Sequence, residues 1–184
     1  MNILIIFHSD YGNTEKMAHA IAAGCQAADT AHTAHVQLKQ TDAVQPHDLI
    51  TADVIVLGTP VHMGSMAWPM KKLADSTSKL WIEDLLEGKI GGVFACSGGL
   101  GGAGGGVEQT LISLHSLLLE HGMIVVGFPK SLLGYADAGL QWGVCARTGN
   151  HEGMPSGIQE SALTACRSYG AHLFKVAQKY TTPK

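Results

Sequence analysis

The segment S-D-Y-G-N-T at residues 9–14 joins hydroxyl groups, an amide and a glycine directly after a short apolar run at residues 3–7. Apolar residues at helical spacing follow, so this loop is expected to end at a helix amino-terminus. Free backbone N–H groups and the helix dipole favour an anion at such a place. The chain has no G-x-x-x-x-G-K-[ST] motif, which argues against a nucleoside triphosphate. A single phosphate group fits this loop better, and an ordinary capped helix is the alternative.

A second candidate segment, G-T-P-V-H-M-G-S-M at residues 58–66, follows the apolar run at residues 54–57. Glycine and proline mark the end of a strand, and Gly64 allows the backbone to approach a ligand closely. The apolar side chains of Val61 and Met63 could lie against a flat ring. Packing in the core is the alternative role for the methionines.

A third candidate segment, C-S-G-G-L-G-G-A-G-G-G at residues 96–106, is rich in glycine. Glycines let backbone N–H and C=O groups reach the edge of a planar ligand. Residues 99–104 match G-x-G-x-x-G, but that fingerprint belongs to the first strand–helix turn, and here it follows a late strand. A flexible loop that binds nothing is the alternative.

The rest of the chain predicts the frame for these loops. Strands are expected at residues 3–7, 35–38, 54–57, 90–96 and 123–126, and helices at 14–28, 67–79, 107–121 and 156–179, the last capped by Ser156. Alternating strands and helices predict a parallel sheet covered on both faces, within a single domain over residues 1–184. Ligands of such sheets bind beyond the carboxyl ends of the strands, where all three loops are expected. The role of residues 129–155 stays open.

Composition excludes several classes of protein. The chain has 184 residues, of which 46% are hydrophobic and 15% charged, with a formal net charge of −3, so it is not a disordered chain. The sequence has no basic cluster for nucleic acid, no apolar stretch of membrane-spanning length and no signal peptide, which predicts a cytoplasmic protein. No metal site is expected from the histidine spacing. The cysteines form no C-x-x-C pair and are expected as free thiols: Cys25, Cys96, Cys145 and Cys166.

These loops carry a family resemblance. The S-x-Y-G-N-T loop resembles the phosphate loop of flavodoxins and of flavodoxin-like NAD(P)H:quinone oxidoreductases, and G-T-P-x-x-x-G-x-M is similar to the segment that grips the flavin in the WrbA-type branch. E-Q-T at residues 108–110, H-G-M at 121–123 and L-W at 80–81 extend the resemblance. The chain departs from the branch at His62, where an arginine is usual, and at Met63, where an aromatic residue is usual. Its third loop is also longer and poorer in hydroxyls.

The resemblance implies a flavodoxin-like three-layer α/β/α sandwich with a five-stranded parallel sheet of order 2-1-3-4-5, and FMN as cofactor. It implies that Trp81 reaches the flavin site of a neighbouring subunit and that His121 lies by the flavin as a possible proton donor; both also suit the end of a helix. The residues that it places around FMN are Ser9, Tyr11, Gly12, Asn13, Thr14, Pro60, Val61, His62, Met63, Gly64, Ser97, Gly98, Gly99 and Gly101.

The activity implied is FMN-dependent transfer of a hydride from NADH or NADPH to a quinone, in a homo-oligomer, either a tetramer or a dimer. A flavodoxin that carries single electrons is one alternative, but such carriers tend to be strongly acidic, and this chain has no acidic runs. A protein that keeps the fold without flavin is another. The choice between NADH and NADPH and the identity of the acceptor stay open.

Overall fold

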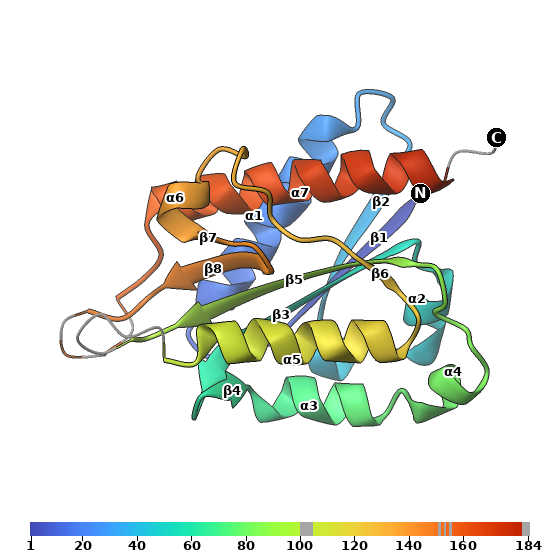
Figure 1. Ribbon diagram of the computed structural model, residues 1–184, viewed down its shortest axis with the longest axis horizontal. Helices are drawn as coiled ribbons and strands as arrows, with labels where there is room; N and C mark the ends of the chain where they lie inside the picture. The colour runs from blue at the N-terminus through green and yellow to red at the C-terminus, as the bar shows by residue number, and fades with distance from the viewer. Residues whose placement is uncertain (100–104, 151, 153, 155, 182–184) are drawn as a thin grey trace.

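A sheet with helices on both faces forms the centre of the molecule (Figure 1). The computed structural model describes residues 1–99, 105–150, 152, 154 and 156–181. Within them the sheet has eight strands, and its main path has the order β2-β1-β3-β5-β8-β7. The short β4 pairs antiparallel with β3, and β6 pairs with β5.

The four inner strands are buried over most of their length, as parallel sheets with helices on both faces require. They are β1 (Asn2–Phe7), β3 (Val54–His62), β5 (Ile90–Ser97) and β8 (Gly143–Arg147). All pair in parallel, with Ile5 opposite Val56 and Gly58 opposite Phe94. The edge strand β2 (His35–Gln40) is only half-buried, which explains its weaker pattern. Consequently the carboxyl ends of β1, β3, β5 and β8 lie along one edge of the sheet.

Alternate strand residues face two separate cores. Ile3, Ile5 and Val56 face α1 (Asn13–Ala28) and α7 (Glu160–Thr181). Leu4, Ile6 and the intervening residues of the other strands face the opposite layer. Figure 1 places α3 and α5 in that layer. It comprises α2 (Pro46–Thr51), α3 (Trp68–Asp75), α4 (Ser78–Ile82) and α5 (Val107–Glu120), preceded in the chain by a short 3-10 helix at Thr41–Ala43.

The two helices of the first layer touch at glycines. A Cβ atom on Gly24 would lie 2.0 Å from the Arg167 carbonyl oxygen, and one on Gly170 would lie 2.0 Å from that of Ile21. The Cys25 thiol donates to the Gly170 carbonyl at 3.2 Å across the same contact. The backbones of α1 and α7 therefore approach too closely for any side chain at these two positions.

The prediction of a five-stranded sheet of order 2-1-3-4-5 was wrong in the number of strands and in the strand at the last position of the order. The order 2-1-3-4 is present as β2-β1-β3-β5, but the run at residues 123–126 forms only a two-residue strand, β6 (Ile124–Val125). The chain leaves the sheet there and returns through α6 (Tyr135–Ala138), β7 (Gly139–Leu140) and β8. Strand β8 then pairs with residues 94–97 of β5, beyond the part that β6 covers. Residues 139–147 thus complete the sheet.

Two helix predictions also needed correction. The expected helix at residues 67–79 is divided into α3 and α4, because the Ser76 and Thr77 hydroxyls each donate to a carbonyl three residues earlier, at 2.7 Å. Ser156 is not a helix cap: its backbone N–H and its hydroxyl donate to the Thr148 carbonyl, and α7 begins at Glu160. Two of the expected helices are present nearly as predicted, as α1 and α5.

Candidate active site

The loops after β1, β3, β5 and β8 surround one hollow at the carboxyl edge of the sheet. Its walls come from Ser9, Asp10, Tyr11, Asn13, Thr14, Pro60, Val61, His62, Cys96, Gly98 and Thr148. Parallel pairing explains the assembly, since it brings the ends of neighbouring strands to the same edge. Segments far apart in the sequence therefore meet here.

The first loop has the features of an anion site. Gly12 adopts φ +76° at the start of α1, a left-handed conformation that glycine takes without strain. Among the described residues no side chain caps the helix, so its first N–H groups stay available to a ligand. The Ser9 hydroxyl is buried without a hydrogen-bond partner among the described residues. A buried polar atom left unpaired is costly, and a phosphate oxygen would satisfy it.

A contact between Thr14 and Cys96 closes the floor of the hollow. The Thr14 hydroxyl lies 3.2 Å from the Cys96 sulfur, and both side chains are buried. Burial raises the pKa of the Cys96 thiol, so the neutral thiol is the stable form. The contact joins the start of α1 to the end of β5 and fixes the first loop against the third.

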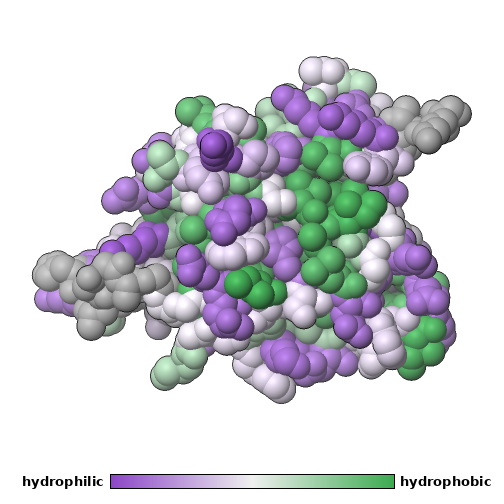
Figure 2. Space-filling model, viewed as in Figure 1, coloured by the Kyte–Doolittle hydropathy of each residue, from purple (hydrophilic) through white to green (hydrophobic). Residues whose placement is uncertain are grey.

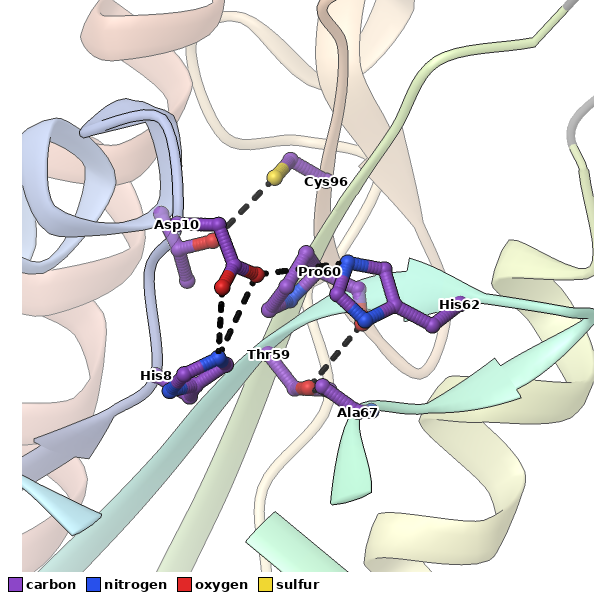
Figure 3. Close-up of polar contacts among 8 residues, drawn as sticks. His8, Asp10, Thr59, Pro60, His62, Ala67 and Cys96 are labelled. Atoms are coloured by element: carbon purple, nitrogen blue, oxygen red, sulfur yellow. Dashed lines mark hydrogen bonds and ion pairs between the residues drawn. The ribbon is translucent and has the colours of Figure 1, made fainter. Parts of the chain in front are cut away.

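The second segment forms a β-hairpin. Strand β3 ends at His62, β4 (Ser65–Met66) runs back beside it, and Met63 and Gly64 make the turn with φ of +49° and +81°. Two positive φ values are typical of a type I′ turn. Behind the turn, the buried Thr59 hydroxyl donates to the Pro60 carbonyl and accepts the Ala67 N–H, both at 3.0 Å. Figure 3 shows the Thr59–Ala67 contact beside His62.

The third segment lies against both the hairpin and the end of β8. A Cβ atom on Gly106 would lie 2.6 Å from the Gly64 Cα atom, so the two backbones touch. On the other side, the Thr148 N–H donates to the Ser97 carbonyl at 2.8 Å, and the Gly149 N–H donates to the Gly98 carbonyl at 3.0 Å. These bonds join the end of β5 to the residues after β8, with Gly98 on the hollow.

The Asp10 carboxylate contacts two histidines, one on the hollow and one beside it (Figure 3). His8 follows β1, Asp10 lies in the first loop, and His62 ends β3. The His8 Nε2 atom lies 3.2 Å from either Asp10 carboxylate oxygen, and His62 Nε2 lies 3.4 Å from Oδ2. Asp10 therefore links the first loop to the hairpin. The described residues hold no group of three side chains suited to a metal ion.

The structure brings most of the expected cofactor residues together. Ser9, Tyr11, Asn13, Thr14, Pro60, Val61, His62 and Gly98 line the hollow. Gly12, Met63, Gly64, Ser97 and Gly99 belong to the same loops, with the Met63 side chain fully exposed. Gly101 lies outside the described residues.

Trp81 and His121 lie away from this hollow within the chain. Trp81 is in α4, which Figure 1 places at the opposite end of the sheet from β4. His121 ends α5 beside Gly122 (φ +68°), and its Nε2 lies 2.9 Å from the Thr77 hydroxyl. Burial lowers the pKa of His121. Their expected roles by the flavin stay predictions.

Three lining residues were not among the expected cofactor residues. Asp10 and Cys96 belong to loops that the sequence had singled out, but neither residue type suggested phosphate binding. Thr148 lies in the segment that the sequence left unassigned, where no pattern pointed to a site. Its position follows from the pairing of β8 with β5.

The fold and the hollow define a flavodoxin-like α/β protein with a hollow at the carboxyl edge of its sheet, beside the first strand–helix turn. The sequence profile of the family described as NADPH-dependent FMN reductase matches residues 1–137. The chain belongs to this family.

Comparison with individual proteins agrees. The chain is 30% identical to an "NAD(P)H dehydrogenase (quinone)" of Syntrophobacter fumaroxidans, covering 98% of this chain and 99% of that protein. It is 31% identical to a protein of the same description from Geobacter sulfurreducens, covering 97% and 98%. The resemblance read from the loops is confirmed.

Solved structures resemble this one over nearly the whole chain. A structure described as a WrbA-like flavodoxin protein from Agrobacterium tumefaciens has a TM-score of 0.73 at 28% identity, covering 98% of this chain and 99% of that one. Flavodoxin 1 of Bacillus cereus has a TM-score of 0.65 at 20% identity, covering 95% and 98%. The second likeness concerns the fold alone. None of the described helices is long and apolar enough to cross a membrane.

Proposed function

We propose that this protein binds FMN in the hollow and catalyses the FMN-dependent transfer of a hydride from NAD(P)H to a quinone. The observation that carries the proposal is the buried, unpaired Ser9 hydroxyl beside the uncapped start of α1. The family and the relatives described as NAD(P)H dehydrogenase (quinone) support the choice of cofactor and substrates.

The residues of the hollow fit FMN in two parts. Ser9, Asn13 and Thr14 supply hydroxyl and amide groups at a helix start, where a phosphate is stabilised. The hairpin and residues 97–99 supply apolar surface and backbone groups, which suit the flat flavin ring. The Thr59 bonds fix the residues before and after the hairpin turn to each other.

The chemistry that a bound FMN supplies is two-electron transfer between a nicotinamide and an acceptor. The side chains of the chain bind the phosphate, orient the ring and shield one side of it from water. NAD(P)H and the quinone must then reach the bound FMN from the open side of the hollow. This side lies beside Tyr11 and His62, which are both exposed.

The proposal includes a homo-oligomer, a tetramer or a dimer, made of single-domain chains in the cytoplasm. Hydrophobic side chains gather on the surface between α5 and α7, where Figure 1 places β6 (Figure 2). The exposed apolar residues there include Ile112, Leu119 and Ile124, and α4 adds Trp81 and Ile82. Surfaces of this kind favour association between copies, and association is what would carry Trp81 to a neighbouring site.

The experiment that tests the proposal compares FMN with riboflavin, which lacks the phosphate. The purified protein is titrated with each flavin and binding is followed by quenching of flavin fluorescence. NAD(P)H oxidation is then measured with menadione as acceptor. The variant Ser9→Asp places a carboxylate against the phosphate, and Ser131→Asp adds the same charge in the exposed turn before α6 as a control.

We expect FMN to bind more tightly than riboflavin, and Ser9→Asp to weaken FMN binding at least tenfold, about 1.4 kcal/mol. Riboflavin binding should change much less, and Ser131→Asp should behave like the unchanged chain. A protein that binds neither flavin would refute the proposal. Reduction of the flavin only in the presence of a separate reductase would favour the one-electron carrier instead.

A further inference from the structure

Reduction of a quinone needs a proton as well as a hydride. The hydride carries two electrons and one hydrogen, so the second hydroxyl of the product takes its hydrogen as a proton. The sequence offered His121 for this role, but its Nε2 atom contacts Thr77 and its Nδ1 atom is buried without a partner. Within the chain, His121 lies away from the hollow, and the titratable groups on the hollow itself are better placed.

His62 is the histidine that lines the hollow. It ends β3 beside the hairpin turn, and nearly half of its side chain is exposed. Its Nε2 atom faces the Asp10 carboxylate at 3.4 Å, and no described residue is hydrogen-bonded to Nδ1. Figure 3 shows one ring nitrogen directed at the Asp10 carboxylate, and the other ring nitrogen has no hydrogen-bond partner among the described residues.

We propose that His62, oriented by Asp10, donates the proton that completes quinone reduction. This inference rests on the proposed function. A carboxylate on one nitrogen of an imidazole fixes the orientation of the ring, and the other nitrogen can then carry the proton that is transferred. The N–H bond of His62 breaks and an O–H bond forms on the acceptor, while NAD(P)H supplies the hydride. A proton from solvent then restores His62, so one quinone, one NAD(P)H and one proton give one hydroquinone and NAD(P)⁺.

The other titratable groups around Asp10 and His62 are less suited to this role. Cys96 is buried, bonded to Thr14, and has a pKa raised by burial. His8 contacts the same carboxylate but lines a different hollow, between β2 and the start of α3, with Gln40, Trp68 and Lys72. Tyr11 lines the same hollow as His62, but it has no hydrogen bond to Asp10 or His62 and is largely exposed.

The experiment separates proton transfer from electron transfer by its choice of acceptor. Menadione must take a proton, whereas ferricyanide takes single electrons and needs none. Both rates are measured with NAD(P)H for the unchanged protein, His62→Gln, Asp10→Asn, Asp10→Glu and His8→Gln. His19→Gln, on the exposed face of α1, is the control for loss of an imidazole elsewhere. FMN affinity is measured for each by fluorescence, as a readout that does not depend on turnover.

We expect His62→Gln to lower kcat with menadione by roughly 100-fold, at the lower end of what general acids contribute. Its ferricyanide rate and FMN affinity should stay within about threefold of the unchanged protein, and added imidazole should restore part of the menadione rate. Asp10→Asn should show the same selective loss to a smaller extent, and Asp10→Glu should recover part of it. His19→Gln should keep the menadione rate near that of the unchanged protein, and His8→Gln should lose much less of that rate than His62→Gln.

Two results would overturn the inference. Either His62→Gln retains its menadione rate, or both acceptors are slowed equally while FMN is still bound. An effect of His8→Gln as large as that of His62→Gln would also overturn it. Failure of the proposed function looks different, because the unchanged protein would then bind no FMN or reduce neither acceptor.

Discussion

The hydroxyl of Thr59 offers a direct test of how the hairpin is held. Thr59 and Ala67 are both fully buried, and the hydroxyl accepts the Ala67 N–H while donating to the Pro60 carbonyl. Replacement of Thr59 by Val keeps the shape of the side chain but removes both bonds. The Ala67 N–H then has no partner in a place that water does not reach.

The magnitude follows from these contacts. A buried donor left unpaired costs about 1–3 kcal/mol. For a chain of this size, each kcal/mol lowers the unfolding midpoint by about 2–4 °C, so a loss of about 2 kcal/mol lowers Tm by about 4–8 °C. Thr59→Ser is the matched variant, since it keeps the hydroxyl and loses one buried methyl group, about 1 kcal/mol.

Calorimetry of the chain without flavin measures the stability of both variants, and fluorescence titration measures their FMN affinity. We expect Thr59→Val to be less stable than Thr59→Ser and to bind FMN more weakly, because the hairpin is no longer fixed. The reasoning fails if Thr59→Val is as stable as the unchanged protein, or more stable than Thr59→Ser.

Three further predictions concern the turn, the helix contact and the buried histidine. Met63→Asn should raise the stability of the fold by up to about 1 kcal/mol, because Asn tolerates the left-handed conformation of the turn. It should also weaken FMN binding if Met63 contacts the ring. An unchanged Tm would contradict the turn assignment. Gly24→Ala should lower the free energy of unfolding, measured with urea, by about 1–3 kcal/mol, because the added methyl group meets the Arg167 carbonyl. An unchanged free energy of unfolding would contradict the close contact between α1 and α7. Burial holds the pKa of His121 below its ordinary value of 6.5 in the folded state, so the unfolded chain binds more protons and stability falls as the pH drops below that value. His121→Asn should reduce this fall between about pH 7.5 and 5.5, measured by urea unfolding, and an unaltered pH dependence would exclude His121 as a cause.

Local patterns in the sequence determined most of the frame. Continuous apolar runs predict strands buried on both faces, and 3.6-residue spacing predicts the helices that cover them. The strands β1, β3 and β5 and the helices α1 and α5 could be predicted from neighbouring residues alone. The first loop could also be predicted, because a glycine and hydroxyl groups before a helix start favour a loop suited to an anion.

The tertiary structure determined which strands and loops lie side by side. Strand β8 takes its place because residues 94–97 of β5 extend beyond β6, a fact of pairing that no local pattern encodes. The same pairing brings Thr148 to the hollow, and the hairpin turn brings His62 to Asp10 across about fifty residues of chain. A sequence specifies which groups the chain carries and where strands end. Only the folded sheet brings those ends together and gives each charged group its partner, because the distances between loops depend on the order and register of the strands.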